Sequence, residues 1–399
     1  MHNTINEKNI FCSFCGKSKD DVKTIISSGS LSSISAYICD ECVVFCDEIV
    51  KKVNIDTHLV DLDLYPLNIK KLLDEEVIGQ DQAKEIISVA VFMHMIRIKT
   101  GVGSKSNLLM IGPSGSGKTL MIRTLASILG IPLAISDATA LTESGYVGED
   151  VENVIVRLLQ ACEYDVQKAE KGIVYIDEID KIARKSSEQE RSSHRDVSGE
   201  GVQYGLLKIL EGSTLSINHK SVRGANDTIQ INTKNILFIC GGAFEGIQNI
   251  VKKRINKRII GLGNKLRFFN KENVDTVTTH DLVKFGLIPE FIGRLPVIVP
   301  FDELTEDDLA KIITEPKSSI LKQYRDMLMS VGVDLSMEPE AVRAIAKEAL
   351  QRKIGARGIR SLMEEILFKG IYKIDGKKYK INIGEEEVLN KAVKLQAKG

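Results

Sequence analysis

Short apolar runs alternate with longer stretches of helical periodicity between residues 65 and 300. Two of the runs, Leu108–Ile111 and Ile173–Ile176, are uninterrupted, which predicts strands buried on both faces. Buried strands that alternate with helices are typical of an α/β domain with a parallel sheet. A longer run, Ile86–Ile98, contains a histidine and an arginine and is too short to cross a bilayer, so it predicts a core helix.

The pattern becomes mainly helical after Pro300. Thr305 and Asp308 have the spacing of a capping box at the start of the first of these helices. Further helices are expected near 317–331, 339–351 and 357–370, followed by a short strand at 378–383 and a final charged helix. The chain therefore predicts an α/β domain joined to a smaller, mainly helical domain.

A chain of 399 residues is too long for a single compact core. We expect a cysteine-rich domain at 1–50, a linker at 51–64, a large domain at 65–300 and a small, mainly helical domain at 301–399. Within the large domain, the polar, glycine-flanked residues 183–201 predict a loop.

Positive and negative charges balance, with 54 lysines and arginines against 54 aspartates and glutamates. No net field therefore favours nucleic acid or a membrane. The first ten residues are polar and lack the apolar core of a signal peptide. We expect a cytoplasmic protein with reduced thiols, in which clustered cysteines favour metal binding over disulfides.

Five of the seven cysteines fall within the first 50 residues. Cys12 and Cys15 form one Cys-X-X-Cys pair, Cys39 and Cys42 form a second, and 23 residues separate the two pairs. Four such sulfurs complete a closed tetrahedral site for Zn²⁺, which would hold a small module folded and leave no open position for catalysis. Cys46 is a competing ligand, and four buried cysteines without a metal are the alternative.

A phosphate-binding motif follows the first buried strand. The pattern Gly-X-X-X-X-Gly-Lys-Thr is formed by Gly112, Pro113, Ser114, Gly115, Ser116, Gly117, Lys118 and Thr119. Its glycines let backbone N–H groups converge on phosphates at the start of the following helix. Lys118 should reach the β- and γ-phosphates of ATP, and the Thr119 hydroxyl should bind Mg²⁺.

An acidic pair, Asp177 and Glu178, ends the second buried strand. In a parallel sheet the ends of both strands open onto the same crevice. Asp177 is then placed to help hold Mg²⁺, and Glu178 is placed to orient and polarise the attacking water. The two motifs together predict ATP hydrolysis.

The order of motifs along nearly the whole chain resembles the ClpX family of AAA+ proteins. Besides the cysteine pairs and the nucleotide motifs, the matching segments are residues 77–80, 145–148, 195–201, 235–244, 286–296 and 355–358. They resemble, in that order, the family's adenine-side segment, first and second pore loops, sensor strand, arginine-finger segment and second sensor. The resemblance implies an AAA+ P-loop ATPase that assembles into a homohexamer and unfolds proteins.

The resemblance also implies roles for individual residues around the nucleotide. Val77, Ile78 and Leu120 would contact the bound ATP. Arg294 would reach the γ-phosphate in a neighbouring subunit, where an arginine stabilises the charge that develops on the transferred group. Arg357 would sense the nucleotide from the small domain and complete the catalytic set.

Tyr146 and Val147 lie between two glycines and form an apolar tip. From the residues alone, a tip that grips polypeptide and a turn whose tyrosine packs on the core are about equally supported. The resemblance implies the first reading, a pore loop that holds unfolded or tagged protein substrates. Hinge motion between the two domains would then pull the substrate.

Family members deliver substrates to the ClpP peptidase, and adaptors can bind through the zinc domain. Two segments depart from the family pattern. The basic segment of the pore entrance reads Asn218–Arg223, and the Ile-Gly-Phe tip that docks onto ClpP is not visible in Gly261–Phe269. The second departure predicts weak or absent docking to ClpP.

A zinc-ribbon AAA+ ATPase that remodels nucleic-acid complexes is the main alternative. The balanced charge and the tyrosine-tipped loop argue against it, so we expect neither a nucleic acid nor a membrane as a partner. A protease with its own active site would need a motif such as HExxH or GxSxG, and the chain has neither. A scaffold without turnover does not agree with Lys118, Asp177 and Glu178 all being present.

Overall fold

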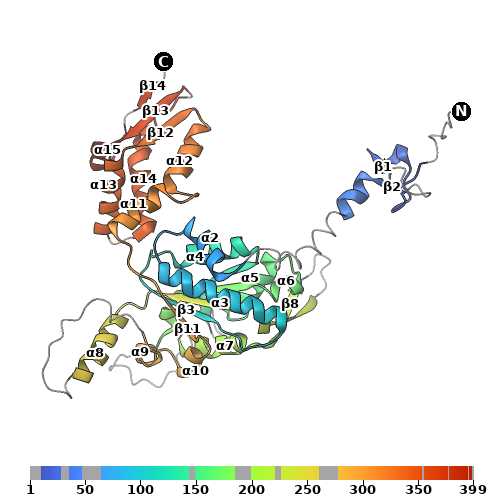
Figure 1. Cartoon of the computed structure of the whole chain (residues 1–399), viewed down its shortest axis with the longest axis horizontal. Coiled ribbons are helices and arrows are strands. Elements are labelled where there is room, and N and C mark those ends of the chain that lie inside the picture. Colours follow the sequence, from blue (N-terminus) through green and yellow to red (C-terminus); the bar gives the residue numbers. More distant parts are fainter. Residues whose placement is uncertain are drawn as a thin grey trace. The chain divides into compact units, whose positions relative to one another are not determined.

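A computed structural model of the chain describes residues 10–27, 36–46, 64–142, 149–184, 199–220, 226–259, 277–352, 355–375, 377–393 and 395–397. The chain forms two compact units, Met1–Leu64 and Tyr65–Gly399, which are described one at a time (Figure 1). Tyr146 and Val147 of the expected pore loop lie outside the described residues, as do most of the second pore loop and the segment 261–269.

The first unit is a small module built on a two-stranded antiparallel sheet. Strands β1 (Ile25–Ser27) and β2 (Tyr37–Cys39) pair with Ile25 opposite Cys39. A short helix over residues 40–46 follows β2 directly. Among the described residues 10–27 and 36–46, the buried hydrophobic residues are Cys12 and Cys39, so the cysteines themselves form the interior of this part.

The second unit is built on a five-stranded sheet with the strand order β11-β3-β10-β7-β4. The strands are β3 (Leu108–Ile111), β4 (Leu133–Asp137), β7 (Ile173–Asp177), β10 (Leu237–Gly242) and β11 (Val297–Pro300). Every neighbouring pair is parallel, which confirms the predicted α/β sheet. All residues of β3 and residues Ile173–Ile176 of β7 are buried, and this burial on both faces explains the two uninterrupted apolar runs.

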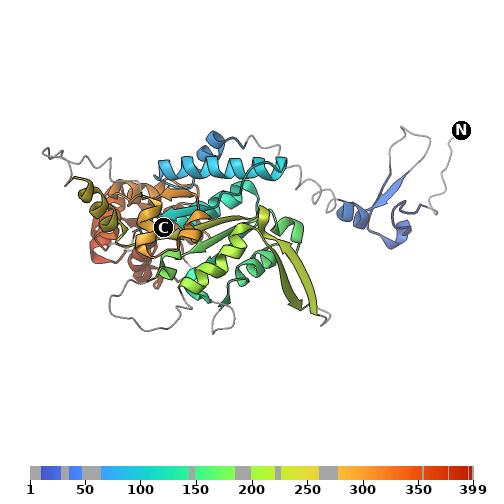
Figure 2. The same cartoon turned by 90° about the horizontal axis from the view of Figure 1, so that it is seen from below.

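Helices cover both faces of the sheet, with α3 on one side and α7 on the other (Figure 2). The α-helices described between residues 65 and 211 are α2 (Pro66–Asp74), α3 (Asp81–Thr100), α4 (Lys118–Leu129), α5 (Asn153–Ala161), α6 (Val166–Ala169) and α7 (Glu200–Glu211). The predicted core helix 86–98 is confirmed within α3. Because α7 already begins at Glu200, the expected loop 183–201 is too long by two residues at its end.

Several smaller elements surround this core. A pair of two-residue strands, β5 (Leu141–Thr142) and β6 (Glu149–Asp150), flanks the segment that contains Tyr146. Strands β8 (Thr214–Lys220) and β9 (Asn226–Asn232) form an antiparallel hairpin that extends away from the sheet (Figure 2). The helices described between β10 and β11 are α8 (Ile247–Ile259), α9 (Thr279–Phe285) and α10 (Pro289–Gly293).

The C-terminal part has its own buried core of leucine, isoleucine and alanine side chains. Its helices are α11 (Glu306–Thr314), α12 (Ile320–Met329), α13 (Pro339–Gln351), α14 (Gly355–Ile371) and α15 (Glu385–Asn390). The capping box is confirmed, because the Thr305 hydroxyl accepts a hydrogen bond from Asp308 N–H at 3.1 Å and the Asp308 carboxylate accepts one from Thr305 N–H at 3.0 Å.

A three-stranded sheet of β12 (Val333–Met337), β13 (Tyr379–Ile383) and β14 (Leu395–Ala397) completes this part. The predicted strand near 378–383 is confirmed as β13. Strand β12 was not expected, because its five residues stand between two helices and alternate only briefly. None of the helices in the described part of the chain is both long and apolar enough to cross a membrane.

Candidate functional site

The loop between β3 and α4 has the geometry of a phosphate cradle. Gly115 and Gly117 have positive φ angles of 78° and 98°, which side-chain-bearing residues rarely adopt, and α4 begins directly afterwards at Lys118. A Cβ at Gly112 would lie only 2.4 Å from the carbonyl oxygen of Phe301. The glycines of the motif are therefore required for steric reasons. The loop that they form leaves the N-terminal N–H groups of α4 facing the site.

The Lys118 side chain is 8% exposed and folds back over its own loop. Its ammonium donates hydrogen bonds to the carbonyl oxygens of Gly112 at 2.6 Å and Pro113 at 2.9 Å. Burial lowers the pKa of Lys118, and the positive charge of Arg357 lowers it further, while Asp177 and Asp180 oppose the shift. Two cations thus share a confined space, an arrangement that an anionic phosphate would stabilise.

Asp177 is held by three donors at the end of β7. Its Oδ2 accepts a hydrogen bond from the Thr119 hydroxyl at 2.8 Å, and its Oδ1 accepts from the Tyr175 hydroxyl at 3.1 Å and from Glu178 N–H at 3.0 Å. Burial and the charge of Asp177 raise the pKa of Tyr175, which keeps this phenol protonated as a donor. A hydroxyl and a carboxylate at this separation are the oxygen ligands that Mg²⁺ uses, so the residues fit the ion.

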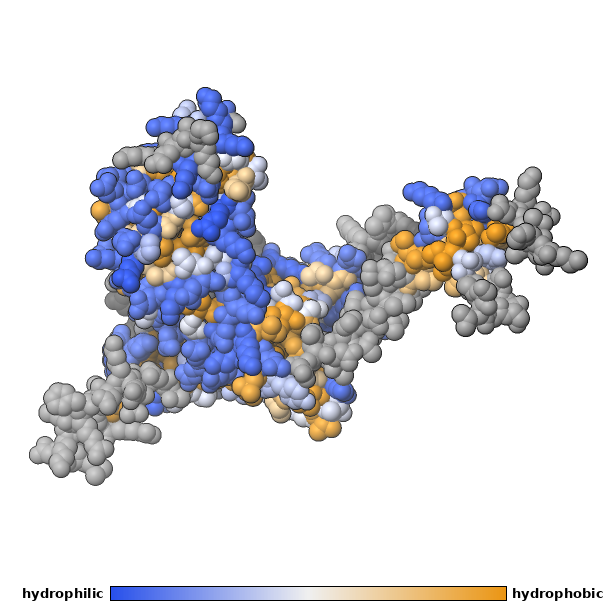
Figure 3. All heavy atoms as spheres, turned by 45° about the horizontal axis from the view of Figure 1, so that its top comes forward, coloured by the Kyte–Doolittle hydropathy of each residue, from blue (hydrophilic) through white to orange (hydrophobic). Residues whose placement is uncertain are grey.

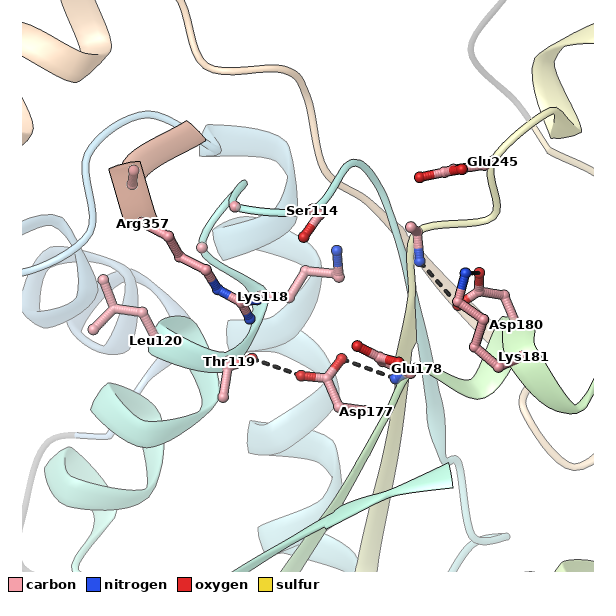
Figure 4. Close-up of a pocket in the computed structure, with 14 residues that line it drawn as sticks. Ser114, Lys118, Thr119, Leu120, Asp177, Glu178, Asp180, Lys181, Glu245 and Arg357 are labelled. Atoms are coloured by element: carbon pink, nitrogen blue, oxygen red, sulfur yellow. Dashed lines mark hydrogen bonds and ion pairs between the residues drawn. The ribbon is translucent and has the colours of Figure 1, made fainter. Parts of the chain in front are cut away.

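Glu178 has a left-handed backbone conformation with φ 55° and ψ 34°. This conformation is uncommon for residues other than glycine, and such outliers concentrate at functional sites. It ends β7 abruptly, so that a 3₁₀ turn (η4, Ile179–Ile182) begins at once and Glu178 lines the pocket. Figure 4 shows its carboxylate beside Asp177 and below Lys118.

A pocket of about 360 Å³ lies at the carboxyl ends of these strands. It is lined by Ser114, Gly115, Gly117, Lys118, Thr119, Leu120, Asp177, Glu178, Asp180, Lys181, Ala243, Glu245, Ala356 and Arg357 (Figure 4). Nine of the residues predicted from the sequence are therefore together in one pocket. Five predicted nucleotide contacts are not among its lining residues: Val77, Ile78, Gly112, Pro113 and Ser116.

Arg357 enters the pocket from α14, in the C-terminal part of the chain (Figure 4). The start of α14 touches the phosphate-binding loop directly, because Ala356 N–H donates to the carbonyl oxygen of Gly115 at 3.4 Å. A Cβ at Gly355 would lie 3.1 Å from the Gly115 backbone, so only glycine allows this approach without displacement. The pocket is thus built by both parts of the second unit.

Arg294 is not part of the pocket of its own chain. It follows α10, is half-exposed, and pairs with Glu211 at the end of α7, with 2.8 Å between guanidinium nitrogen and carboxylate oxygen. Its own carbonyl oxygen accepts a hydrogen bond from Asn107 Nδ2 at 2.9 Å. The side chain is therefore close to the surface and away from Lys118.

Five lining residues were missed by the sequence reading: Asp180, Lys181, Ala243, Glu245 and Ala356. Asp180 is buried, and its Oδ1 accepts a hydrogen bond from Ala243 N–H at 3.1 Å, which ties the turn after β7 to the end of β10. A signal existed for Ala243, which belongs to the segment resembling a sensor strand. No pattern in the sequence marks Glu245 as a pocket residue.

The four predicted zinc ligands converge in the first unit. The Sγ atoms of Cys12, Cys15, Cys39 and Cys42 all lie within 4.8 Å of one another. The Sγ atoms of Cys15 and Cys39 are 3.6 Å apart, close to the sulfur–sulfur separation of about 3.8 Å that Zn–S bonds of about 2.3 Å give in a tetrahedron. Cys46 is described but does not belong to this group, so the competing ligand is set aside.

Backbone N–H groups support two of the sulfurs. Cys39 N–H donates to Cys12 Sγ at 3.3 Å, and Cys42 N–H donates to Cys39 Sγ at 3.5 Å. Such bonds stabilise thiolates, the form in which cysteine binds a metal. The donor set therefore fits a structural Zn²⁺ site with four sulfur ligands.

Three family models match the chain. The ClpX C4-type zinc finger matches residues 10–52, and an AAA domain of the Cdc48 subfamily matches residues 103–298. The chain belongs to the ClpX-like AAA+ proteins. The third model, the C-terminal D2-small domain of ClpB protein, matches residues 304–373.

Membership of the ClpX-like AAA+ proteins makes the chain a Clp-type ATPase chaperone with a zinc-binding finger. The AAA domain accounts for ATP as the nucleotide, and the four-cysteine finger accounts for Zn²⁺. ATP suits the residues of the nucleotide pocket, and Zn²⁺ suits the four cysteine sulfurs.

Proposed function

We propose that this chain is an ATP-driven protein unfoldase and translocase that works as a homohexameric ring. The observation that carries the proposal is the pocket in which Lys118, Asp177 and Glu178 meet Arg357 from the C-terminal part. A pocket shared by two domains lets the bound nucleotide change the angle between them. Repeated changes of that angle are what a ring needs to pull a polypeptide through its pore.

In the proposed reaction, Lys118 leaves the carbonyl oxygens of its loop and binds the phosphates of ATP. Thr119 and Asp177 hold Mg²⁺, which neutralises charge on the phosphate oxygens when it is bound. Glu178 orients the attacking water and accepts its proton. Arg357 stabilises the negative charge of the phosphates from the side of α14.

Arg294 acts on the ATP of a neighbouring subunit in this proposal. Its exposure and its absence from the residues that line the pocket of its own chain support a role in trans. Mixing two inactive variants tests this. Arg294→Ala subunits keep Glu178, and Glu178→Gln subunits keep Arg294, so mixed rings should regain part of the ATPase activity. Mixed rings that stay inactive would mean that Arg294 acts within its own subunit, whereas normal turnover by Arg294→Ala alone would place Arg294 outside the reaction.

Tyr146 and Val147 are the proposed substrate-gripping tip, and unfolded or tagged proteins are the proposed substrates. The zinc module is the proposed docking point for adaptors. Figure 3 shows hydrophobic surface on this module. Its exposed large hydrophobic side chains are Phe11, Phe14, Ile26, Val44 and Phe45. Exposed apolar side chains at this density on a small module are typical of partner surfaces.

The proposed unfoldase activity is tested with a stable fluorescent protein that carries an unstructured tag. We expect its fluorescence to fall only when the tag and hydrolysable ATP are both present. Sedimentation of the Glu178→Gln variant with ATP should show the mass of six chains. ATPase activity that rises strongly with DNA but not with unfolded protein would favour nucleic-acid remodelling instead.

A further inference from the structure

The Gln80 side chain connects three segments that are far apart in the sequence. Gln80 precedes α3, and its side chain is 7% exposed. Its Oε1 accepts a hydrogen bond from Asp302 N–H at 2.9 Å, and its Nε2 donates to the Asp302 carbonyl oxygen at 2.9 Å. Nε2 also lies 3.3 Å from the carbonyl oxygen of Ser116 in the phosphate-binding loop.

The backbone at Asp302 fixes the orientation of this amide. A backbone N–H can only donate, so the oxygen of Gln80 must face it and the nitrogen must face the two carbonyl oxygens. The side-chain amide therefore pairs with the backbone N–H and carbonyl of Asp302, as a neighbouring β-strand would. Its other N–H donates to the Ser116 carbonyl oxygen in the phosphate-binding loop. Asp302 lies between β11 and α11, where the chain passes from the large to the small domain.

The backbone of Gln80 is left-handed, with φ 60° and ψ 37°. Glycine or asparagine adopts this conformation at lower cost than glutamine. A glutamine in such a position indicates that its side chain compensates for the strain. Neither asparagine, with its shorter side chain, nor glycine could reach both Asp302 and Ser116.

Neighbouring residues of the same turn also contact the C-terminal part. Lys317 binds Glu75 through its ammonium at 2.6 Å, and the Ser318 hydroxyl donates to the Glu76 carboxylate. Lys317 N–H additionally donates to the Glu75 carbonyl oxygen at 3.3 Å. The turn 75–80 is therefore attached to the small domain on one side and, through Gln80, to the phosphate-binding loop on the other.

We infer that Gln80 is a positioning residue that transmits the state of the phosphate-binding loop to the junction between the two domains. The inference rests on the proposed function, in which nucleotide changes the angle between the domains. A shift of the Ser116 carbonyl on phosphate binding would change what Nε2 can contact. The paired bonds to Asp302 would pass that change to the segment on which α11 begins.

Gln80→Glu is the matched variant, since it keeps the size and the acceptor for Asp302 N–H but lacks the donor for both carbonyl oxygens. Gln82→Glu is its control, because Gln82 lies in the first turn of α3 and is exposed. Spin labels on genetically encoded keto residues at Lys99 and Leu389, both exposed, report the distance between the domains. Doubly labelled subunits are diluted into unlabelled ones within full rings of the Glu178→Gln background.

We expect ATP to change the distance distribution in the background protein and in Gln82→Glu. In Gln80→Glu, ATP should still bind, while at least half of the distance change is lost. In otherwise unmutated rings, Gln80→Glu should raise the ATP consumed per unfolded substrate at least about fivefold, the low end of typical coupling effects. Gln80→Asn should behave like Gln80→Glu, and it replaces that variant if the glutamate does not fold.

An unchanged distance response in Gln80→Glu would overturn the inference and leave the proposed function intact. Loss of ATP binding in parallel with the distance response would also overturn it, because the residue would then only support the fold of the loop. A background protein that binds ATP without any distance change would contradict the proposed domain motion itself.

Discussion

The Thr119 hydroxyl donates a hydrogen bond of 2.8 Å to Asp177 Oδ2, which joins the start of α4 to the end of β7 across 58 positions of the chain. The contact exists because β3 and β7 both neighbour β10 in a parallel sheet, so their carboxyl ends share one edge. Two residues that are ordinary in isolation thereby become the pair on which the proposed Mg²⁺ site depends.

Glu178→Gln should bind ATP and assemble, yet hydrolyse ATP at least about 10²-fold more slowly. The amide keeps the shape of the side chain but cannot accept the proton of the attacking water. Phosphate release at saturating ATP measures turnover, and calorimetry measures binding. Glu386→Gln, an exposed glutamate on α15, serves as the matched control and should turn over normally. Turnover within twofold of the unmutated chain would remove Glu178 from the proposed mechanism.

Tyr175→Phe should increase the Mg²⁺ concentration needed for half-maximal ATPase activity. The ring stays fully buried, but Asp177 loses one of its three donors. We expect the free energy of unfolding to fall by about 0.5–1.5 kcal/mol, the usual worth of one hydrogen bond. Tyr204→Phe changes an exposed tyrosine in the same way and should alter neither quantity. An unchanged Mg²⁺ requirement would show that the phenol only fills the core.

Elemental analysis should find one zinc ion per chain. Cys42→Ser removes one of the four converging sulfurs and should abolish stoichiometric zinc, whereas Cys46→Ser, from the same short helix, should retain it. Chelation should unfold the first module, because its interior is formed by the ligands themselves, and should leave basal ATPase activity of the second unit largely intact. Zinc retained by Cys42→Ser would refute this ligand set.

Tyr146→Ala should separate ATP hydrolysis from unfolding. Grip on a polypeptide depends on the apolar area of the ring, most of which alanine lacks, while the residues of the nucleotide pocket are unchanged. Turnover should persist while the tagged fluorescent protein stays folded. Tyr146→Phe keeps the ring and should unfold it at the normal rate. Normal unfolding by Tyr146→Ala would mean that the tyrosine is structural.

Docking to the cognate ClpP peptidase should be weak or absent. Within the segment 261–269, Asn264, Lys265 and Arg267 surround Leu266, and burying these polar and charged groups in an apolar cleft would be costly. Pull-down with ATP and degradation of the tagged substrate measure the interaction. Tight binding that survives deletion of 262–269 would reject the argument from this loop, whereas tight binding lost on deletion would indicate a changed anchor.

The sequence by itself determined the phosphate-binding loop, the acidic pair and the cysteine pairs, as well as α3, α4 and the helices of the C-terminal part. These features depend on short-range geometry. Gly115 and Gly117 supply positive φ angles within one loop, and these angles need no distant residue. The parallel sheet was predictable for a related reason, because strands buried on both faces carry continuous apolar runs.

Only the tertiary structure decided which residues surround these motifs. Tyr175 and Glu245 carry no local signal, and Gln80 reaches Asp302 across 222 positions. Arg294 and Arg357 look alike in the sequence, yet one lines the pocket of its own chain and the other pairs with Glu211 outside it. Side-chain contacts of this kind follow from sheet order and from the packing of one domain on another, which no local pattern of residues encodes.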